Sequence, residues 1–556
     1  MFDRHYAKWP ENAPKTLTLP ETSIYRNLEI SALRYPGKTA INYYETPITY
    51  AELERDAEAI AGYLQRLGVG KGDRVLLFMQ NSPQFVIAYY GILRANAVVV
   101  PINPMNRTAE LTHYLQDTGA RVALCGQELF PQIAPLIGAD SLTDVIVAAY
   151  GDYVRAPTAL TLPEHVAMER VPVSQPGAHL WADVITAGAE PGPHTAGPDD
   201  YCVFPYSSGT TGAPKGCIHT HRSVMATVLG GVNWFRNNPE SVLLSTLPMF
   251  HVTGMQSGMN SPIYMGATVV MMTRWDRTTA AELIERYRIT GWTNITTMAI
   301  DFLSDPEVRK RDLSSLQTIG GGGAAMPAAV EAKLYELTGL RYIEGYGLSE
   351  TIAGTHINPP DAPKAQCLGI PIFGVDSRIV DPDTLEELGP NETGEIVSHG
   401  PQVFQGYWNR PEETAAAFIE LDGKRFFRTG DLGYYDEEGY FFIVDRLKRM
   451  INASGYKVWP SEVESLMYAH PAIREVCVIA SPHPRRGETV KAVVVLDPEY
   501  PEPVDEQGII AWCHEQMSAY KCPELVEFAG DLPRSPTGKV MWRALQEQER
   551  EAAAAD

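Results

Sequence analysis

The stretch Tyr206-Ser-Ser-Gly-Thr-Thr-Gly-Ala-Pro-Lys-Gly216 draws nine of its eleven residues from Ser, Thr, Gly, Pro and Lys. Glycine lets backbone N–H groups approach phosphate oxygens, hydroxyls add hydrogen-bond donors, and Lys215 adds a positive charge. The apolar run Tyr201-Cys-Val-Phe-Pro205 before it predicts a strand, and Thr220-His-Arg-Ser223 after it predicts the start of a helix. The order of strand, loop and helix predicts an α/β fold with a polyphosphate-binding loop.

This loop differs from the common P-loop, which requires Gly-x-x-x-x-Gly-Lys-Ser/Thr. Counted from Gly209, Pro214 stands at the second glycine and Gly216 at the hydroxyl residue that binds magnesium. The alternative is a flexible Ser/Gly/Thr linker. An apolar strand directly before the loop disfavours that alternative.

Composition and charge restrict the class of protein. The chain has 556 residues, of which 44% are hydrophobic and 21% charged, as in ordinary globular proteins of several domains. The net charge of -22 opposes non-specific binding to nucleic acids or anionic membranes. The seven cysteines are scattered without a C-x-x-C pair, which predicts reduced thiols in the cytoplasm and no zinc site. Neither a signal peptide nor a membrane span is expected.

Alternating helical and strand patterns run from Ile24 to about Val147, with helices over 50–67 and 85–93 and a buried strand over 74–79. This alternation predicts a parallel sheet with crossover helices. The proline-rich residues 151–200 predict an irregular surface connection. A second α/β unit follows the glycine loop and extends to about Leu340.

The pattern changes near Gly369, where short strands and turn signals predict a β-rich subdomain. After Lys448 a smaller α/β unit is expected, in which Ser461-Glu-Val-Glu464 predicts a capping box and 476–480 and 491–496 predict strands. We therefore expect a large N-terminal domain over 1–447, including the β-rich part at about 369–447, and a small mobile C-terminal domain over 448–556.

A second glycine cluster, Ile319-Gly-Gly-Gly-Gly-Ala-Ala325, leaves an alternative open. Gly320-x-Gly322-x-x-Ala325 satisfies the dinucleotide fingerprint, and Glu344 lies at about the distance of the acid that binds the ribose. A Rossmann oxidoreductase using NAD is thus the second interpretation. It does not account for the loop at Tyr206 or for Thr429-Gly-Asp431.

Two further segments carry candidate ligand-binding groups. In Tyr342-Ile-Glu-Gly-Tyr-Gly-Leu-Ser-Glu-Thr351, Tyr346 could stack on a base, Glu350 could bind Mg²⁺ and Thr351 could donate to a phosphate. In Phe427-Arg-Thr-Gly-Asp-Leu-Gly433, the carboxylate of Asp431 could accept both hydroxyls of a ribose. Taken alone, a strand with a turn explains the first segment equally well, and a turn aspartate the second.

Together these segments resemble the adenylate-forming superfamily, which includes acyl-CoA synthetases, adenylation domains and firefly luciferase. The resemblance covers nearly the whole chain and involves six motifs in the family order. They are Tyr206–Gly216, Leu247-Pro-Met-Phe-His251, Tyr342–Thr351, Arg428–Gly433, Asp445–Ile451 with Gly455–Glu464, and Pro533-Arg-Ser-Pro-Thr-Gly-Lys539.

The resemblance implies a site for each ligand. The residues it assigns to ATP are Ser207, Ser208, Gly209, Thr210, Thr211, Lys215, Gly322, Gly345, Tyr346, Gly347, Thr351, Asp431, Arg446 and Lys539. It implies catalytic roles for Lys539, Thr211, Glu350 and His251, a hinge at Lys448, and Glu350 as the ligand of Mg²⁺. The acyl pocket would include His251, Met255 and Gly323, and Gly455, Tyr456 and Trp459 would bind CoA.

The roles implied for the lysines agree with the chemistry of adenylation. Attack of a carboxylate on the α-phosphate brings two anions together, so cations and fixed donors must offset their repulsion. Lys539 follows the short turn Pro536-Thr-Gly538 and would reach both anions. The alternative for this lysine is a solvated surface charge.

The acid is expected to be apolar. Amino-acid-activating relatives place an aspartate where this chain has His251, which disfavours an amino acid. No charged residue lies between His251 and Met272, and seven of the 17 methionines fall within 50 residues, as in a deformable apolar cavity or in a methionine-rich core. Trp292-Thr-Asn-Ile-Thr-Thr-Met298 is similar to bacterial medium- and long-chain fatty acyl-CoA synthetases.

The expected reaction joins an apolar carboxylic acid, a medium- or long-chain fatty acid, to CoA, with ATP and Mg²⁺, through an acyl-adenylate. Gly455-Tyr-Lys-Val-Trp-Pro460 is similar to CoA-using members, and no carrier domain is expected after Lys539. The alternatives are an aryl- or aryl-alkyl-acid CoA ligase, an acyl-AMP ligase loading a separate carrier protein, and a non-catalytic nucleotide-binding regulator. No nucleic-acid partner is expected, and a homodimer stays open.

Overall fold

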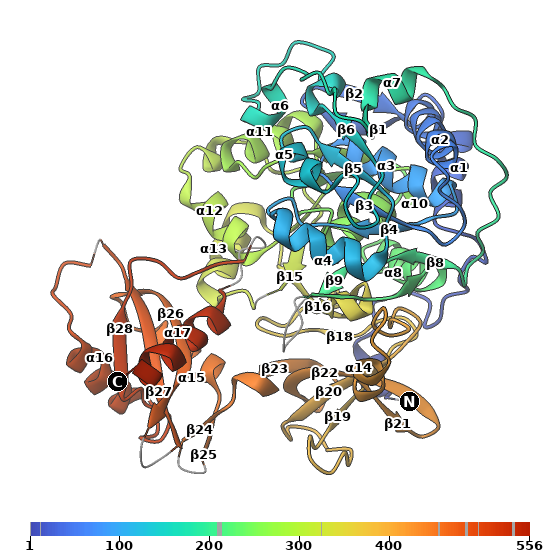
Figure 1. Cartoon of the computed structure of the whole chain (residues 1–556). Helices are drawn as coiled ribbons and strands as arrows, with labels where there is room; N and C mark the ends of the chain where they lie inside the picture. The colour runs from blue at the N-terminus through green and yellow to red at the C-terminus, as the bar shows by residue number, and fades with distance from the viewer. Residues whose placement is uncertain are drawn as a thin grey trace. The chain divides into compact units, whose positions relative to one another are not determined.

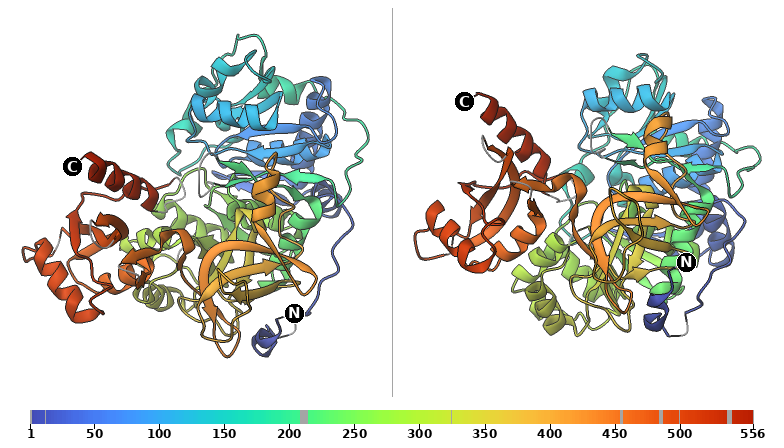
Figure 2. Two further views of the ribbon diagram at one scale, coloured as in Figure 1. Left: turned by 60° about the horizontal axis from the view of Figure 1, so that its bottom comes forward. Right: turned by 90° about the horizontal axis from the view of Figure 1, so that it is seen from below.

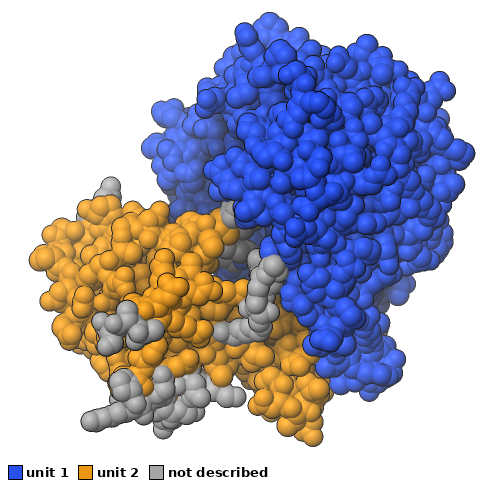
Figure 3. Space-filling model, in the orientation of Figure 1, with its two compact units in different colours: residues 1–377, 398–427 blue, residues 378–397, 428–556 orange. Residues whose placement is uncertain are grey.

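The computed structural model describes residues 2–11, 13–207, 214–323, 325–453, 456–483, 487–498, 500–535 and 540–555. The chain divides into two compact units, which Figure 3 distinguishes by colour. Unit 1 comprises residues 1–377 and 398–427, and unit 2 comprises residues 378–397 and 428–556. The sequence predicts that the part of the chain after Lys448 moves between reaction steps. This domain boundary stays a prediction.

The first sheet of unit 1 has seven strands in the order β11-β8-β4-β3-β5-β6-β7. Its central strands are buried along their length and pair in parallel, which explains their continuous apolar sequences. Its strands are β3 (Arg74–Phe78), β4 (Val98–Pro101), β5 (Val122–Gly126), β6 (Asp144–Ala148), β7 (Ala178–Leu180), β8 (Tyr201–Val203) and β11 (His219–Thr220). The buried strand predicted over 74–79 is confirmed as β3, and the alternation of strands and helices predicted around it is confirmed as well.

The second sheet of unit 1 has nine strands in the order β18-β17-β16-β15-β14-β12-β13-β1-β2. Strands β1 and β12 to β16 pair in parallel, and β2, β17 and β18 pair antiparallel at the two edges. The strands are β1 (Thr39–Tyr43), β2 (Thr46–Thr49), β12 (Val242–Ser245), β13 (Thr268–Met271), β14 (Gly291–Asn294), β15 (Thr318–Gly322), β16 (Ile343–Leu348), β17 (Ala353–Ile357) and β18 (Ile370–Pro371).

Helices α3 (Pro83–Arg94) and α8 (His221–Trp234) join the cores of the two sheets. Every residue from Pro83 to Leu93 in α3 is buried, and an all-round apolar helix is expected where both sides are covered. One hydrophobic cluster includes side chains of both sheets and of these two helices. Figure 1 shows the blue and green helices packed among the strands of unit 1. A predicted helix, α2 (Tyr50–Arg66), begins at a capping box of Thr49 and Glu52.

The remaining helical segments of unit 1 surround these layers. In chain order, the helical segments of unit 1 are η1 (Arg4–Lys8), α1 (Tyr25–Arg34), α2, α3 (Pro83–Arg94), α4 (Thr108–Thr118), α5 (Phe130–Ile133), η2 (Ala134–Leu136), η3 (Tyr150–Tyr153), α6 (Glu164–Ala167), α7 (Trp181–Thr186), α8 (His221–Trp234), α9 (Val252–Met255), the π-helix η4 (Gln256–Asn260), α10 (Ser261–Met265), α11 (Arg277–Tyr287), α12 (Thr296–Ser304), η5 (Val308–Lys310), α13 (Ala328–Thr338), η6 (Ser349–Thr351) and α14 (Pro411–Ala416).

The prediction of an irregular connection over 151–200 is wrong in part. Ala178–Leu180 forms strand β7, which pairs in parallel with β6, and Trp181 at the start of α7 is only 1% exposed. Prolines restrict the backbone only near their own positions, so they do not prevent a short segment between them from joining a sheet edge.

Short antiparallel strands follow Asp376, in agreement with the predicted β-rich region. They are β19 (Asp376–Val380), β20 (Gly394–His399), β21 (Phe418–Leu421), β22 (Lys424–Tyr435) and β23 (Phe441–Arg446). The long strand β22 pairs with β21 in its first part and with β23 in its second part.

The rest of unit 2 is a small α/β layer structure. Its elements are η7 (Leu447–Arg449), β24 (Ile451–Ala453), β25 (Tyr456–Val458), α15 (Pro460–Met467), β26 (Ile473–His483), β27 (Gly487–Leu496), α16 (Glu506–Gln516), β28 (Leu525–Phe528) and α17 (Trp542–Ala555). Alternate residues of β26 and β27 face α17 on one side and α15 with α16 on the other. Figure 2 shows the C-terminal red helix on the opposite side of the strands from the two orange-red helices.

The predicted capping box at Ser461 is wrong. Helix α15 begins at Pro460, and its N-cap residue Trp459 makes no side-chain cap. The backbone N–H of Ser461 instead donates to Asp445 Oδ2 at 2.7 Å, and Glu464 pairs with Arg449. A carboxylate from a preceding strand thus replaces the local cap.

Within the described residues, no helix has the length and apolar character needed to cross a bilayer.

Candidate active site

The two ends of the glycine-rich loop form a short ribbon. Strand β9 (Tyr206–Ser207) pairs antiparallel with β10 (Lys215–Gly216), so that Ser207 lies opposite Lys215. Helix α8 follows after β11, and the hydroxyl of its N-cap residue Thr220 accepts from Ser223 N–H, as the sequence predicts. Loop residues 208–213 between the ribbon strands lie outside the described part of the chain. The predicted site residues among them are Ser208, Gly209, Thr210 and Thr211.

Lys215 is held by two side chains of the segment around α14. Its Nζ lies 5.3 Å from the centroid of the Tyr407 ring and forms an ion pair with Glu413. The side chain is 16% exposed. An ammonium in this position can interact with phosphate oxygens when they replace the carboxylate of Glu413.

Glu350 lies in the turn η6, directly after β16. Its Oε1 accepts a hydrogen bond from Tyr407 Oη at 2.9 Å, and its backbone C=O accepts from Phe404 N–H at 2.8 Å. Burial lowers the pKa of His219 to about 4, so at pH 7 the neutral ring donates from Nε2 to Ser349 O at 2.8 Å. Strand β16 and His219 therefore hold this turn.

The hydroxyl of the neighbouring Thr351 is hydrogen-bonded to the local backbone. It is buried, and its Oγ1 accepts from Leu348 N–H at 2.9 Å and donates to Ala353 O at 2.7 Å. Ile352 and Ala353 then adopt positive φ values of 46° and 100°, which non-glycine residues rarely adopt outside constrained turns. The predicted contact of Thr351 with a phosphate stays a prediction.

Tyr346 projects from β16 beside His356, with ring centroids 5.7 Å apart. The adjoining glycines are required for close backbone approach. A Cβ on Gly347 would lie 1.8 Å from Ala353 O, and one on Gly322 would lie 2.2 Å from Gly345 O. Packing of β15, β16 and β17 therefore explains these glycines without a ligand.

The dinucleotide fingerprint at Gly320 is contradicted by the fold. In that fingerprint the glycines form the turn between strand and helix, whereas here Gly320 and Gly322 pair in parallel with β16 inside strand β15. Glu344, expected at a ribose, accepts instead from the backbone N–H groups of Met326 at 3.1 Å and Gln366 at 2.7 Å. The structure therefore contradicts both observations that favoured the oxidoreductase interpretation, the glycine fingerprint and the ribose-binding role of Glu344.

His251 is the N-cap residue of α9, at the end of the motif that begins at Leu247. This motif is held by Asn81, whose Nδ2 donates to Leu247 O at 2.8 Å and whose Oδ1 accepts from Met249 N–H at 2.8 Å. A π-helix, which occurs often at functional sites, follows α9 directly. Asn81 is a positioning residue that sequence reasoning did not identify.

The methionine-rich stretch contributes to the core of unit 1. Five of its methionines belong to one hydrophobic cluster, and Met298 packs against that cluster. The five are Met249, Met255, Met259, Met271 and Met272. The core interpretation therefore accounts for most of this stretch, and the predicted acyl-pocket roles of Met255 and Gly323 stay predictions.

Asp431 and Arg446 face each other across β22 and β23 of unit 2. They are directly paired in register, and Arg446 Nε lies 2.8 Å from Asp431 Oδ1. Asp431 is fully buried, and Gly430 before it has a φ of +69°. Glu395 holds this turn, because its carboxylate accepts from Arg428 and from Gly430 N–H at 3.1 Å. Glu395 was also missed in the sequence.

The predicted hinge and CoA residues lie around η7 and α15. The backbone of Lys448 belongs to η7, and Trp459 is the N-cap of α15. The side chain of Lys448, that of Tyr456 in β25, and all of Gly455 lie outside the described part of the chain. The catalytic candidate Lys539 also lies outside it.

Magnesium would have to use few protein ligands. Across the described residues there is no group of three or more His, Cys, Asp or Glu placed to hold a metal ion. Mg²⁺ commonly binds one or two carboxylates together with substrate phosphates and water. A single carboxylate at Glu350, which is hydrogen-bonded to Tyr407, fits this mode.

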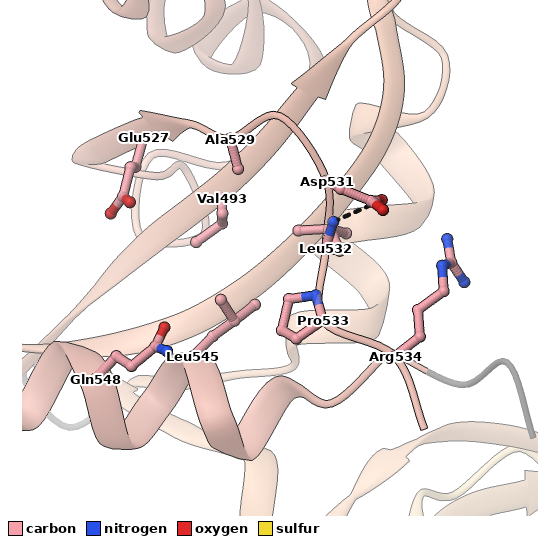
Figure 4. Close-up of a pocket in the computed structure, with 9 residues that line it drawn as sticks. All are labelled: Val493, Glu527, Ala529, Asp531, Leu532, Pro533, Arg534, Leu545 and Gln548. Atoms are coloured by element: carbon pink, nitrogen blue, oxygen red, sulfur yellow. Dashed lines mark hydrogen bonds between the residues drawn. The ribbon is translucent and has the colours of Figure 1, made fainter. Parts of the chain in front are cut away.

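A cavity of 570 Å³ lies in unit 2 between β27 and α17. Figure 4 shows Val493 and Leu545 lining its apolar side and Asp531 and Arg534 on the chain segment beside it. Of the residues predicted to bind ATP, none that the structure describes lines this cavity. Its chemistry does not point to the nucleotide.

Comparison with known proteins now identifies the family. The model of AMP-binding enzymes matches residues 28–408, and the model of the C-terminal domain of these enzymes matches residues 462–539. The chain belongs to the AMP-binding enzyme family. The resemblance to adenylate-forming enzymes is therefore confirmed.

Relatives of known name cover almost the whole chain. A long-chain-fatty-acid–CoA ligase of Bacillus subtilis is 36% identical over 98% of each chain. A feruloyl-CoA synthase of Amycolatopsis is 33% identical over 91% of this chain and 95% of its own. The structure of ATP-bound MatB from Rhodopseudomonas palustris matches with a TM-score of 0.84 and 28% identity, covering 96% of this chain and all of its own. This member of the AMP-binding family thus shares its fold with an enzyme solved with ATP.

Proposed function

We propose that the protein is an ATP-dependent, AMP-forming carboxylic acid:CoA ligase. It would convert an acid, ATP and CoA into acyl-CoA, AMP and pyrophosphate through an acyl-adenylate. The observation that carries the proposal is the connection of Lys215 and Glu350 through Tyr407, in a family member similar over its full length to a CoA ligase. A phosphate-binding cation and a magnesium-binding carboxylate are the two groups that adenylation requires together.

The proposed binding roles are those that the family resemblance implies, and the chemistry of each side chain supports them. Lys215 would attract the phosphates, and Tyr346 would stack on adenine. The buried carboxylate of Asp431 would accept the hydroxyls of the ribose, with Arg446 beside it. Bound through Glu350, Mg²⁺ would supply positive charge at the phosphate oxygens.

The proposed catalytic step rests on Lys539. Its ammonium would lie where the carboxylate of the acid meets the α-phosphate and would offset their repulsion. Residues around Lys448 would then let the C-terminal part turn, so that Gly455, Tyr456 and Trp459 meet CoA for the thioester step. His251 would stand at the acyl pocket.

We further propose that the acid is a medium- or long-chain fatty acid. The relative from Bacillus subtilis is named for long-chain fatty acids, and the stretch after His251 has no charged residue up to Met272. An aryl-alkyl acid is the second candidate, because the relative from Amycolatopsis is named for feruloyl-CoA. A cytoplasmic location belongs to the same proposal and is supported by seven cysteines that are all unlinked.

A coupled assay of AMP release tests the reaction. Acetate, octanoate, palmitate, benzoate and a cinnamate are offered with ATP and Mg²⁺, with and without CoA. We expect acid-dependent pyrophosphate release with octanoate or palmitate and acyl-CoA only when CoA is present. Adenylate that accumulates with CoA but passes to a phosphopantetheinylated carrier would identify a carrier-loading ligase instead. No pyrophosphate release with any acid would contradict the proposed function.

A further inference from the structure

The phenol of Tyr407 contacts two groups that come from distant parts of the chain. Its Oη donates to Glu350 Oε1 at 2.9 Å, and the Nζ of Lys215 lies 5.3 Å from its ring centroid. One side chain thus uses its polar edge for a carboxylate and its aromatic ring for an ammonium. All three residues belong to unit 1.

The backbone around Tyr407 is bound to both of the segments that it connects. Trp408 N–H donates to Gly216 O at 2.8 Å, next to Lys215, and Ile218 N–H donates to Gly406 O at 2.9 Å. On the other side, Phe404 N–H donates to Glu350 O at 2.8 Å. The Phe404 ring also meets the Tyr407 ring edge to face, with centroids 4.8 Å apart. These contacts leave the phenol little freedom to move away.

The chemistry of the phenol suits both contacts. The ordinary pKa of a phenol is about 10, well above neutral pH. The hydroxyl therefore stays protonated at neutral pH and acts as a donor to the carboxylate. The face of an aromatic ring attracts a cation without neutralising it, so Lys215 keeps its charge for an anionic ligand.

We propose that Tyr407 is a positioning residue that orients the Glu350 carboxylate for Mg²⁺ and holds the Lys215 ammonium beside it for the triphosphate. This inference rests on the proposed function, in which Glu350 binds the metal and Lys215 the phosphates. Tyr407 itself touches neither the acid nor CoA in this role. With one Oε1 lone pair occupied by the phenol, Oε2 of Glu350 stays available to the metal.

Tyr153 of unit 1, which is buried whereas Tyr407 is half-buried, provides a control. Tyr153 Oη donates to Asp56 Oδ2 at 2.7 Å, and neither residue belongs to the segments around Lys215 and Glu350. Tyr153→Phe removes the same kind of tyrosine–carboxylate hydrogen bond as Tyr407→Phe. Any difference between the two variants in Mg²⁺ dependence thus reflects position and not the loss of a tyrosine–carboxylate hydrogen bond as such.

The test measures thermal unfolding at a fixed ATP concentration while Mg²⁺ is varied, because a ligand that binds the folded state raises the Tm. Tyr407→Phe should raise the Mg²⁺ concentration at the midpoint of this stabilisation by about tenfold, as expected for a lost hydrogen bond to a charged group. Tyr407→Leu should in addition weaken stabilisation by ATP at saturating Mg²⁺, since Lys215 loses its aromatic contact. Tyr153→Phe should lower the Tm without moving the Mg²⁺ midpoint.

A double-mutant cycle with Glu350→Gln separates positioning from a general structural effect. In the Glu350→Gln background, Tyr407→Phe should leave the Mg²⁺ midpoint unchanged, because its partner is already neutral. An equal shift in both backgrounds, or a midpoint for Tyr407→Phe equal to that of the parent protein, would overturn the inference. A parent protein that is not stabilised by ATP with Mg²⁺ and shows no acid-dependent pyrophosphate release would instead contradict the proposed function.

Discussion

Two basic residues proposed to meet ATP already pair with carboxylates of the protein. Lys215 pairs with Glu413, and Arg446 pairs with Asp431. The two pairs differ in exposure, because the Glu413 side chain is 41% exposed whereas that of Asp431 is 1% exposed. Phosphate oxygens can therefore displace Glu413 at low cost, while the buried carboxylate of Asp431 is fixed for hydrogen bonding.

Replacing Glu413 should consequently improve binding of the nucleotide. We expect Glu413→Gln to lower the KM for ATP by about two- to fivefold, since an ion pair whose carboxylate side chain is partly exposed contributes about 1 kcal/mol. The measurement is acid-dependent pyrophosphate exchange at varied ATP. Glu412→Gln, on the neighbouring exposed residue, is the control and should leave this KM unchanged. A higher KM for Glu413→Gln would show that the carboxylate supports Lys215 and does not compete for it.

Lys539 should be required for only one of the two half-reactions. We expect Lys539→Ala to abolish formation of the acyl-adenylate from acid and ATP, an effect of roughly 3 kcal/mol or more on the barrier by analogy with oxyanion donors. Formation of the thioester from presynthesised acyl-adenylate and CoA should persist. Both half-reactions are measured separately, and an equal loss in both would rule out the assigned role.

Glu344 should make stability depend on pH. Burial raises its pKa to about 7 from an ordinary value of 4.5. The folded state holds the proton more tightly, so this contribution to stability is complete below about pH 4.5 and is lost as the pH rises through 7. Glu344→Gln stays neutral, so its Tm relative to that of the parent protein should rise between pH 5 and pH 8. The corresponding difference in unfolding free energy changes by at most about 1.4 kcal/mol per pH unit.

The exposed residue Glu336 of α13 is the matched control for this titration. Glu336→Gln should follow the pH profile of the parent protein. If Glu344→Gln and the parent protein show a constant difference in Tm across this range, the carboxyl of Glu344 does not titrate there.

At the scale of elements, the residues that flank Lys448 are anchored to the small domain. Asp445 Oδ2 accepts from Ser461 N–H at the start of α15, and Arg449 Nη2 donates to Val478 O at 3.1 Å in β26. Lys448 thus lies in a short turn, and the residues Asp445 before it and Arg449 after it are both hydrogen-bonded to other elements of unit 2. A change of backbone torsion at Lys448 between half-reactions would therefore have to break the contact of Asp445 with Ser461.

Proline at this position tests the hinge. Lys448→Pro fixes φ near -65°, which should exclude one of the two conformers. We expect pyrophosphate exchange to survive and transfer to CoA to fall. Lys448→Ala, which keeps the backbone free, should retain both steps. A proline variant normal in both steps would remove the hinge from the mechanism.

At the scale of the whole molecule, the apolar character of the acid should determine the rate profile. Each buried methylene contributes about 0.8 kcal/mol, so three additional methylenes can favour a longer acid over acetate by tens of fold. We expect kcat/KM along a straight-chain series from C2 to C16 to reach its maximum at a medium or long chain. A maximum at C2, or faster turnover of an amino acid, would contradict an apolar pocket.

The sequence alone determined much of the architecture and the family. Alternating apolar strands and amphipathic helices predicted the α/β layers, and Thr220 predicted the start of α8, because period and capping are local properties of the chain. The order of six motifs predicted the family. Local patterns failed at Ser461, where Asp445 of β23 replaces the cap, and at Trp181, where a sheet edge and a core recruit part of a proline-rich segment.

Only the tertiary structure decided which side chains meet. Tyr407 lies between Lys215 and Glu350, Glu395 holds the turn before Asp431, and Asn81 holds the motif of His251. Pro411 and the acidic residues after it signal the start of α14, but no local pattern names the lysine that Glu413 pairs with. Spacing along a chain encodes the contacts within a helix or strand, whereas contacts between distant segments follow from how the layers pack, and so these positioning residues were visible only in the folded protein.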